Sequence, residues 1–354
     1  MSKLCAVINP QALQPGDVIL TTHTFSPTSF MIRKGTKCAY SHAIIVVDPT
    51  SVFEAIGLGV HAQNTLRLRY RNTNEIRVLR YQGLQKDQIR DIILYLRTHY
   101  AMAYSTWDAI KSALYCFVGH KIRIKMNTRK TFCSQFVAKA YAKAGICING
   151  KNPEFIRPKD IDLDKKFIDV PNAILTIPQK KVTGPNFIKM QDNIVCPMMR
   201  KIWKILKKYG VEIKGEPEIF RGISLIDDPN KRLTADRKIA AVILKSGYLT
   251  NWKNEYDACP ENHVFRDFYA KYEKEPNFKG LALNKLRFWE QDAIRRQQNL
   301  STMEICNQIN PSQYKPLISA YLYIQLERRL LINATEAIQE FQNGLYKVLH
   351  GFSV

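Results

Sequence analysis

Two neighbouring segments in the first half of the chain combine strand-forming apolar residues with a tight turn between them. Segment 40–48 reads YSHAIIVVD, and segment 51–62 reads SVFEAIGLGVHA after a Pro-Thr pair. Apolar, β-branched runs bounded by turn residues favour strands, so we expect these segments to form an antiparallel hairpin. Similar patterns predict further strands at 13–20, 75–81, 167–170 and 174–178.

Helical periodicity, with apolar residues three and four positions apart, dominates the remaining chain. In the first half it predicts helices at about 85–99, 105–118 and 131–145. After a polar stretch with Gly184 and Pro185, helical signals recur with few strand signals between them, near 195–209, 234–248, 263–274, 281–297 and 315–349. We therefore expect an α+β protein with a sheet-containing domain at 1–178, a linker or surface crossing at 179–194, and a helical accessory domain at 195–354.

The segment 131–145, TFCSQFVAKAYAKAG, predicts a helix that carries a cysteine in its first turn. Thr131 is a candidate N-cap, and Gly145 lies where a left-handed C-terminal residue is preferred. The helix dipole and the unpaired amides of the first turn favour a thiolate at Cys133 and can bind an oxyanion. Taken alone, a cysteine in a helix is more often a core residue than a nucleophile.

A cysteine nucleophile needs a general base and a group that orients this base. His42 begins a strongly hydrophobic strand, where its side chain would be held rigidly. Glu54 lies on the returning strand between apolar neighbours, where an unpaired carboxylate would be unfavourable. Whether His42 and Glu54 share a face depends on the strand register, which the sequence does not give. A structural role for His42 is the alternative.

Composition narrows the class of protein. The hydrophobic content of 45% is that of a globular protein, and the net charge of +22 favours polyanionic partners such as nucleic acid or anionic lipid. The eight cysteines show neither a CxxC pair nor zinc-ligand spacing, so we expect reduced thiols and neither metal nor cofactor. With no signal-peptide pattern and no apolar run of membrane-spanning length, we expect no transmembrane segment and a protein that is cytoplasmic or exported without a cleaved signal.

Basic clusters suggest an alternative function without catalysis, namely binding to nucleic acid or to an anionic membrane. They read RLRYRN at 67–72, HKIRIKMNTRK at 120–130 and RKIWKILKKYG at 200–210. Segment 195–209 has an apolar and a basic face, so it could lie on a membrane or pack against the protein. The absence of helix-turn-helix, zinc-finger and RNP signatures disfavours nucleic acid. A catalytically inactive scaffold is a third alternative, which the full set of matched groups disfavours.

Five motifs, taken in order, resemble the permuted NlpC/P60 papain-like enzymes of the YiiX/YaeF-like amidase group. They are PGDVILT at 15–21, YSHAIIVVD at 40–48, VFEAIGLGV at 52–60, EIRVLRY at 75–81 and TFCSQFVAKAYAKAGI at 131–146. In this group, as here, the histidine strand precedes the cysteine helix. The resemblance covers 13–175 and implies a permuted papain-like fold with Cys133 as nucleophile, His42 as base, Glu54 as third member and Tyr40 at the site rim.

The resemblance also implies an activity. It points to a cysteine hydrolase or acyltransferase, amidase-like, that acts through a thioester on a peptide-like amide or an acyl lipid. Members of the group with a periplasmic role carry an export signal, which this chain lacks, so a cell-wall substrate is not expected. A toxin or effector that acts in another cell is one interpretation of a basic enzyme with an added helical domain. The region beyond residue 180 resembles no part of the group.

Overall fold

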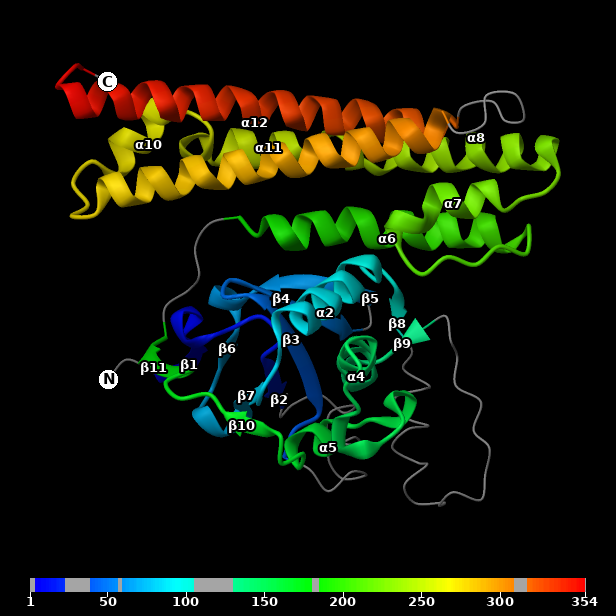
Figure 1. The fold of residues 1–354 in the computed structure, drawn as a ribbon, viewed down its shortest axis with the longest axis horizontal. Coiled ribbons are helices and arrows are strands. Elements are labelled where there is room, and N and C mark those ends of the chain that lie inside the picture. Colours follow the sequence, from blue (N-terminus) through cyan, green and yellow to red (C-terminus); the bar gives the residue numbers. More distant parts are fainter. Residues whose placement is uncertain are drawn as a thin grey trace. The chain divides into compact units, whose positions relative to one another are not determined.

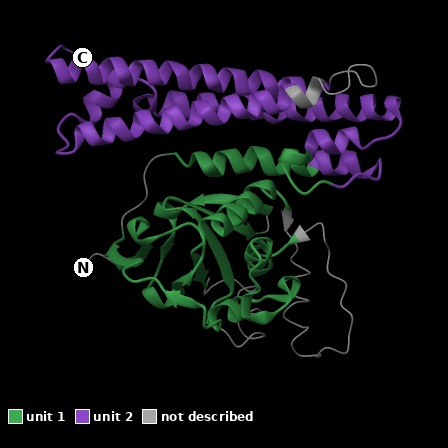
Figure 2. Ribbon diagram, viewed as in Figure 1, with its two compact units in different colours: residues 1–200, 213–218 green, residues 201–212, 219–354 purple. Residues whose placement is uncertain are grey.

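The chain forms two compact units. The computed structural model describes residues 4–22, 39–56, 59–104, 130–179, 185–308 and 317–353 (Figure 1). The first unit comprises Met1–Arg200 and Ile213–Glu218, and the second comprises Lys201–Glu212 and Ile219–Val354 (Figure 2). The helix expected at 105–118 and most of the basic cluster at 120–130 lie outside the described residues.

The first unit contains a six-stranded antiparallel sheet in the order β10-β7-β2-β3-β4-β5. Its strands are β2 (Val18–Thr21), β3 (His42–Asp48), β4 (Ser51–Ile56), β5 (Gly59–Asn64), β7 (Ile76–Tyr81) and β10 (Phe167–Asp169). A second, three-stranded sheet has the order β11-β1-β6, with β1 (Leu4–Ile8), β6 (Arg69–Tyr70) and β11 (Ile174–Pro178). A short parallel pair joins β8 (Ala103–Tyr104) to β9 (Lys130–Thr131). The predicted α+β class and antiparallel sheet are confirmed.

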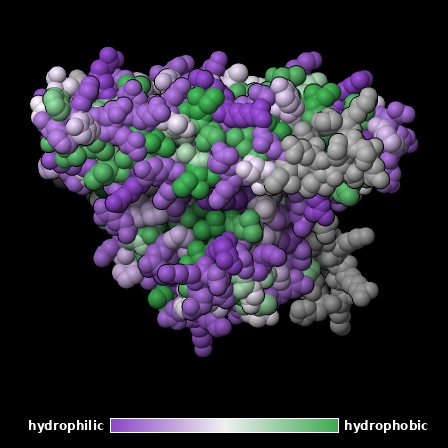
Figure 3. Space-filling model, turned by 45° about the horizontal axis from the view of Figure 1, so that its top comes forward, coloured by the Kyte–Doolittle hydropathy of each residue, from purple (hydrophilic) through white to green (hydrophobic). Residues whose placement is uncertain are grey.

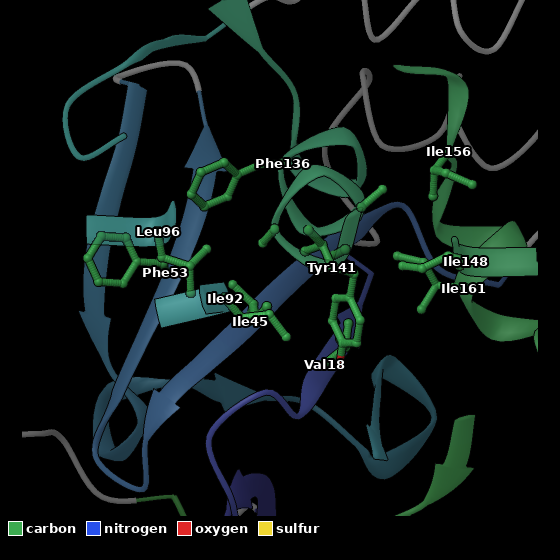
Figure 4. Packing of buried hydrophobic residues seen from close by; sticks show 14 of the residues in the cluster. Val18, Ile45, Phe53, Ile92, Leu96, Phe136, Tyr141, Ile148, Ile156 and Ile161 are labelled. Atoms are coloured by element: carbon green, nitrogen blue, oxygen red, sulfur yellow. The ribbon is translucent and has the colours of Figure 1, made fainter. Parts of the chain in front are cut away.

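Both faces of the six-stranded sheet are buried, which explains the continuous apolar runs in its central strands. On one face, Val18, Ile45 and Phe53 pack with α2 (Lys86–Thr98) and α4 (Cys133–Lys143). Figure 4 shows part of this cluster, in which α4 contributes Phe136 and Tyr141. On the other face, Ile19, Ile44, Val46 and Val52 pack with residues of the smaller sheet and its flanking loops. Burial on both sides removes much apolar surface from water and holds β3 rigidly between two layers.

The cysteine-bearing helix α4 begins and ends close to the predicted residues, but its N-cap differs. Phe132 is the N-cap, and Cys133 is the first helical residue. Thr131 was expected to cap the helix, but its hydroxyl instead donates a hydrogen bond to Oε1 of Gln135 (3.0 Å). Gly145 follows the helix with φ of +77°, as its predicted role requires.

Among its described residues, the first unit also contains the α-helices α5 (Pro158–Asp162) and α6 (Phe187–Lys207), and α6 continues into the second unit. The segment 179–194, expected to be a linker or surface crossing, is helical from Phe187 onward. Its polar composition suggested a surface crossing, yet Asp192 is buried in an ion pair. The first unit accordingly extends to Arg200 instead of ending at residue 178.

The second unit is helical, as predicted for the C-terminal region. Its further helices are α7 (Ile219–Ser224), α8 (Pro229–Ser246), α9 (Trp252–Ala258), α10 (Phe265–Tyr272), α11 (Phe278–Gln308) and α12 (Ile318–His350). The two long helices α11 and α12 are joined by apolar packing of Trp289 against Ala334 and Ala337 and by an ion pair between Arg296 and Glu327. Among the described residues, no helix has the length and apolar character needed to cross a bilayer.

Two arginines on β7 allow a test of which ion pair stabilises the sheet. Arg80 binds Asp17 through two hydrogen bonds (2.7 and 2.8 Å), and Asp17 is only 1% exposed. Arg77 binds Asp169, whose side chain is 67% exposed, and Asp162, whose side chain is 19% exposed. Arg80→Ala leaves the buried carboxylate of Asp17 with only the Gln14 amide as a partner and should lower the free energy of unfolding by about 3–5 kcal/mol, whereas Arg77→Ala should lower it by less, because both of its partners reach solvent.

The measurement is hydrogen-exchange mass spectrometry across a urea series, followed on peptides from β2, β3 and β7. These peptides report the stability of the sheet separately from that of the helical unit. Equal losses in the two variants would contradict this assignment of the buried pair.

Candidate active site

The three residues predicted to carry chemistry meet in the first unit. His42 opens β3, Glu54 lies in β4, and Cys133 is the first residue of α4. Nε2 of His42 lies 2.5 Å from Oε2 of Glu54, and the side chains of His42 and Cys133 are hydrogen-bonded. Because Nε2 of His42 is engaged by Glu54, Nδ1 is the nitrogen left for the thiol. Cys133 and Glu54 are 5% and 6% exposed, so bulk water does not screen these contacts.

A register shift in the β3–β4 hairpin places His42 and Glu54 on one face. Asp48 pairs with Ser51 beside the turn, but Val46 pairs with Val52, which leaves Val47 as an extra residue on β3. Glu54 consequently pairs with Ile44, which shares its face of β3 with His42. Without this bulge, Glu54 would lie opposite residue 45 and point to the other face, among the apolar side chains that contact α4.

Each of the three groups is held in its charged form. Burial lowers the pKa of His42, but the Cys133 thiolate and the Glu54 carboxylate outweigh burial and raise it well above its usual range. Burial raises the pKa of Cys133, but the charge and hydrogen bond of His42 outweigh burial and lower it. Burial also raises the pKa of Glu54, and hydrogen bonds from His42 and His61 reverse this effect and lower it strongly. These shifts favour a thiolate–imidazolium pair backed by a carboxylate.

Backbone and side-chain contacts fix the start of α4. The amides of Ala43 and Ser134 donate hydrogen bonds to the Cys133 sulfur and favour the thiolate. The Ser134 hydroxyl donates to the carbonyl oxygen of Ile156 (2.8 Å). Nε2 of Gln135 donates to Oε2 of Glu154 (2.6 Å). These contacts join the first turn of the helix to the loop before α5 and hold Cys133 against the edge of β3.

Four further polar side chains extend this site, and the sequence did not single them out. Oε1 of Glu54 accepts a hydrogen bond from Gln63 (2.9 Å) and lies 3.1 Å from Nε2 of His61. Nδ1 of His61 lies 3.0 Å from Oδ2 of Asp192 in α6. The hydroxyl of Tyr100 donates to Oδ1 of Asp192 (2.7 Å). His61 could have been found from its place on the returning strand, but no local signal connects it to Asp192, which is 131 residues away.

Tyr40, predicted at the site rim, is half-buried and packs against the apolar cluster that contains α4. Its place at the rim stays a prediction. In the described part of the chain, no group of three or more His, Cys, Asp or Glu side chains is arranged to hold a metal ion. The five cysteines with described side chains, Cys5, Cys133, Cys147, Cys196 and Cys259, are free thiols.

The ion pair predicts unusual reactivity of Cys133. A thiolate that persists below the ordinary pKa of cysteine should react with iodoacetamide at about pH 6, at least about tenfold faster than the exposed Cys147. In His42→Ala the cation is lost while burial remains, so the pKa of Cys133 should rise and labelling should require alkaline pH. Mass spectrometry of labelled peptides across pH identifies the reacting cysteine. A labelling rate of Cys133 that rises with pH only in the alkaline range, as expected for an ordinary thiol, would contradict the thiolate.

Comparisons with known proteins identify no family for this chain. No protein-family model matches the chain, and no curated protein matches it. The resemblance of residues 13–175 to permuted papain-like enzymes therefore stays a prediction from short motifs. A functional assignment has to rest on the contacts among Cys133, His42 and Glu54.

Proposed function

We propose that this protein is a cysteine hydrolase or acyltransferase that acts on an amide or ester carbonyl through a thioester intermediate. One observation carries the proposal: Cys133, at the start of a helix, is hydrogen-bonded to His42, and His42 is held by the buried carboxylate of Glu54. Nucleophile, base and orienting acid are the parts that covalent catalysis by cysteine requires.

The proposed reaction begins with the thiolate of Cys133, whose proton already resides on His42. The sulfur attacks the carbonyl carbon, and a tetrahedral oxyanion forms near the unpaired amides of the first turn of α4. As the bond to the leaving amine or alcohol breaks, His42 gives its proton to the leaving group. Neutral His42 then takes a proton from water, or from another acceptor, as this attacks the thioester. The carboxylic acid or the acylated acceptor leaves, and the ion pair re-forms.

We also propose that the first unit has the permuted papain-like fold. Three observations support this: the histidine strand precedes the cysteine helix, the sheet is antiparallel, and α4 packs against one of its faces. The substrate would be a peptide-like amide or an acyl lipid, the two classes that the resemblance implies. Both present a carbonyl carbon that a thiolate can attack.

The proposal predicts an acyl-enzyme. Intact-protein mass spectrometry after incubation with a panel of acyl esters, thioesters and peptide amides should detect an adduct on Cys133 or release of product. Cys133→Ser and His42→Ala should lower turnover by at least about 10²- to 10⁴-fold, because each removes a group that takes part in every step. Cys147→Ser, on an exposed turn, is the matched control and should change nothing. Turnover that survives Cys133→Ser would refute the proposal.

A second candidate function is binding to anionic lipid surfaces, and exposed cations of α6 favour it. Arg200, Lys201, Lys204 and Lys207 are all exposed. The apolar face of this helix is buried within the protein through Met198, Met199, Ile202 and Leu206. The helix therefore does not lie in a membrane by its apolar face, and only its charges are available to lipid head groups.

The other basic clusters give less support to binding. In the cluster at 67–72, Arg67 donates to the carbonyl oxygen of Pro185, and Arg69 lies 3.6 Å from the sulfur of Cys5, so both bind within the protein. On the face shown in Figure 3, hydrophilic residues predominate and hydrophobic residues form separate groups between them. A solvated basic surface would look the same, so the distinction needs an experiment.

Vesicle co-sedimentation distinguishes these two interpretations. At about 1 kcal/mol per cation near an anionic surface, Lys201→Gln/Lys204→Gln/Lys207→Gln should weaken binding to phosphatidylserine vesicles about 100-fold. Cys133→Ser should bind like the wild type. Three exposed lysines of α8 supply the matched control, Lys231→Gln/Lys238→Gln/Lys245→Gln. Equal weakening in both triple variants would indicate non-specific attraction only.

A further inference from the structure

His61 lies between two carboxylates in the interior of the first unit. Its Nε2 lies 3.1 Å from Oε1 of Glu54, an ion-pair contact without the alignment of a hydrogen bond, and its Nδ1 is hydrogen-bonded to Oδ2 of Asp192 at 3.0 Å. All three side chains are at most 7% exposed. Glu54 and His61 are directly opposed on β4 and β5, and Asp192 comes from α6, beyond the part of the chain that resembles papain-like enzymes.

Counting protons on the imidazole shows what this arrangement requires. A neutral imidazole carries one N–H, so one of its nitrogens would face a carboxylate oxygen with a lone pair. A ring nitrogen and a carboxylate oxygen that both present lone pairs repel each other at about 3 Å. In a buried site, neither would then have a hydrogen-bond donor. An imidazolium presents an N–H to each carboxylate, so it can hydrogen-bond Asp192 through Nδ1 and form an ion pair with Glu54 through Nε2.

Glu54 transmits this arrangement to the proposed catalytic pair. Its Oε1 accepts a hydrogen bond from Gln63 and lies 3.1 Å from Nε2 of His61. Its Oε2 contacts Nε2 of His42. A carboxylate whose first oxygen is held by the hydrogen bond from Gln63 and the ion pair with His61 cannot rotate away from His42 without losing both contacts. We propose that His61 is a positioning residue of the active site, held as an imidazolium between Glu54 and Asp192 so that the second oxygen of Glu54 is directed at His42. This inference rests on the proposed function.

The titratable surroundings agree with a cation at this position. The titratable groups that interact electrostatically with Glu54 include His42 and Tyr70. Those that interact with Asp192 include Tyr100 and Cys196, and the charge of Glu216 also raises the pKa of Tyr100. Burial lowers the pKa of His61, but hydrogen bonds to Asp192 and Glu54 outweigh burial and raise it to about 9. A pKa raised in this way means that the imidazolium is present at neutral pH and is lost as the pH rises through about 9.

A pair of double variants separates positioning from mere packing. Gln and Met have similar length and shape, but only Gln can donate a hydrogen bond to Glu54. Asp192→Asn accompanies each substitution, so that no buried carboxylate is left unpaired. His61→Gln/Asp192→Asn should keep the pKa of His42 near its wild-type value. His61→Met/Asp192→Asn should lower it by at least about one unit, because Glu54 keeps only Gln63 on its first oxygen.

The measurement is NMR of full-length protein with isotope-labelled histidine, titrated from about pH 5 to pH 10. In the wild type, the signal of His61, identified by its loss in His61→Gln/Asp192→Asn, should remain that of an imidazolium up to about pH 9. In Asp192→Asn alone, His61 should lose its proton at least about one pH unit earlier, because the neighbouring negative charge is gone.

The titration of His42 should stay unchanged in Asp192→Asn. The carboxamide introduced at position 192 can donate to Nδ1 of a neutral His61, while the N–H on Nε2 still reaches Glu54. Asn193→Ala, on the exposed side of α6, is the matched control and should leave both titrations unchanged.

Two results would overturn the inference. One is a neutral His61 at pH 7 in the wild type, and the other is an identical His42 titration in the Gln and Met variants. Neither NMR titration needs a substrate, so both test the positioning role of His61 independently of the proposed catalytic activity. Failure of the proposed function would appear separately, as the absence of any acyl adduct on Cys133.

Discussion

The buried carboxylate of Glu54 is the constraint on which the described site depends. A carboxylate at 6% exposure is stable as an anion only if its oxygens are fully engaged. His42 engages one oxygen, while Gln63 and His61 engage the other. These contacts offset the desolvation penalty of the buried carboxylate and fix its orientation. They also keep the His42 imidazole oriented beside Cys133. Removing the charge of Glu54 would disturb every group in this chain of contacts.

The charges of the site alternate in sign from one end to the other. The favoured charged forms are a thiolate, an imidazolium, a carboxylate, an imidazolium and a carboxylate, from Cys133 through His42, Glu54 and His61 to Asp192. Each charge is flanked by the opposite sign, so the buried network needs no contribution from bulk solvent. A poorly screened interior strengthens each of these contacts, and by the same argument it makes the loss of any one partner expensive. The supporting contacts also extend beyond the segment that resembles papain-like enzymes, because Asp192 belongs to α6, which continues into the helical unit.

The sequence by itself determined the local elements and the candidate chemistry. Apolar runs identified β3 and β4, helical spacing and Gly145 identified α4, and the residue types identified Cys133, His42 and Glu54. These signals are local, since propensity and periodicity act over a few neighbouring residues. They were sufficient for the α+β class, the antiparallel sheet and the helical C-terminal region.

Only the tertiary structure decided which face each site residue occupies and what surrounds it. The extra residue Val47 shifts the hairpin register by one position, and this shift alone brings Glu54 to the side of His42. Because side chains alternate along a strand, such a shift reverses the face, and no local preference of this segment announces it. The pairing of His61 with Asp192 likewise spans 131 residues, and only the packing of the first part of α6 within the sheet-containing unit creates it. Local sequence specified the groups, and long-range packing specified their partners.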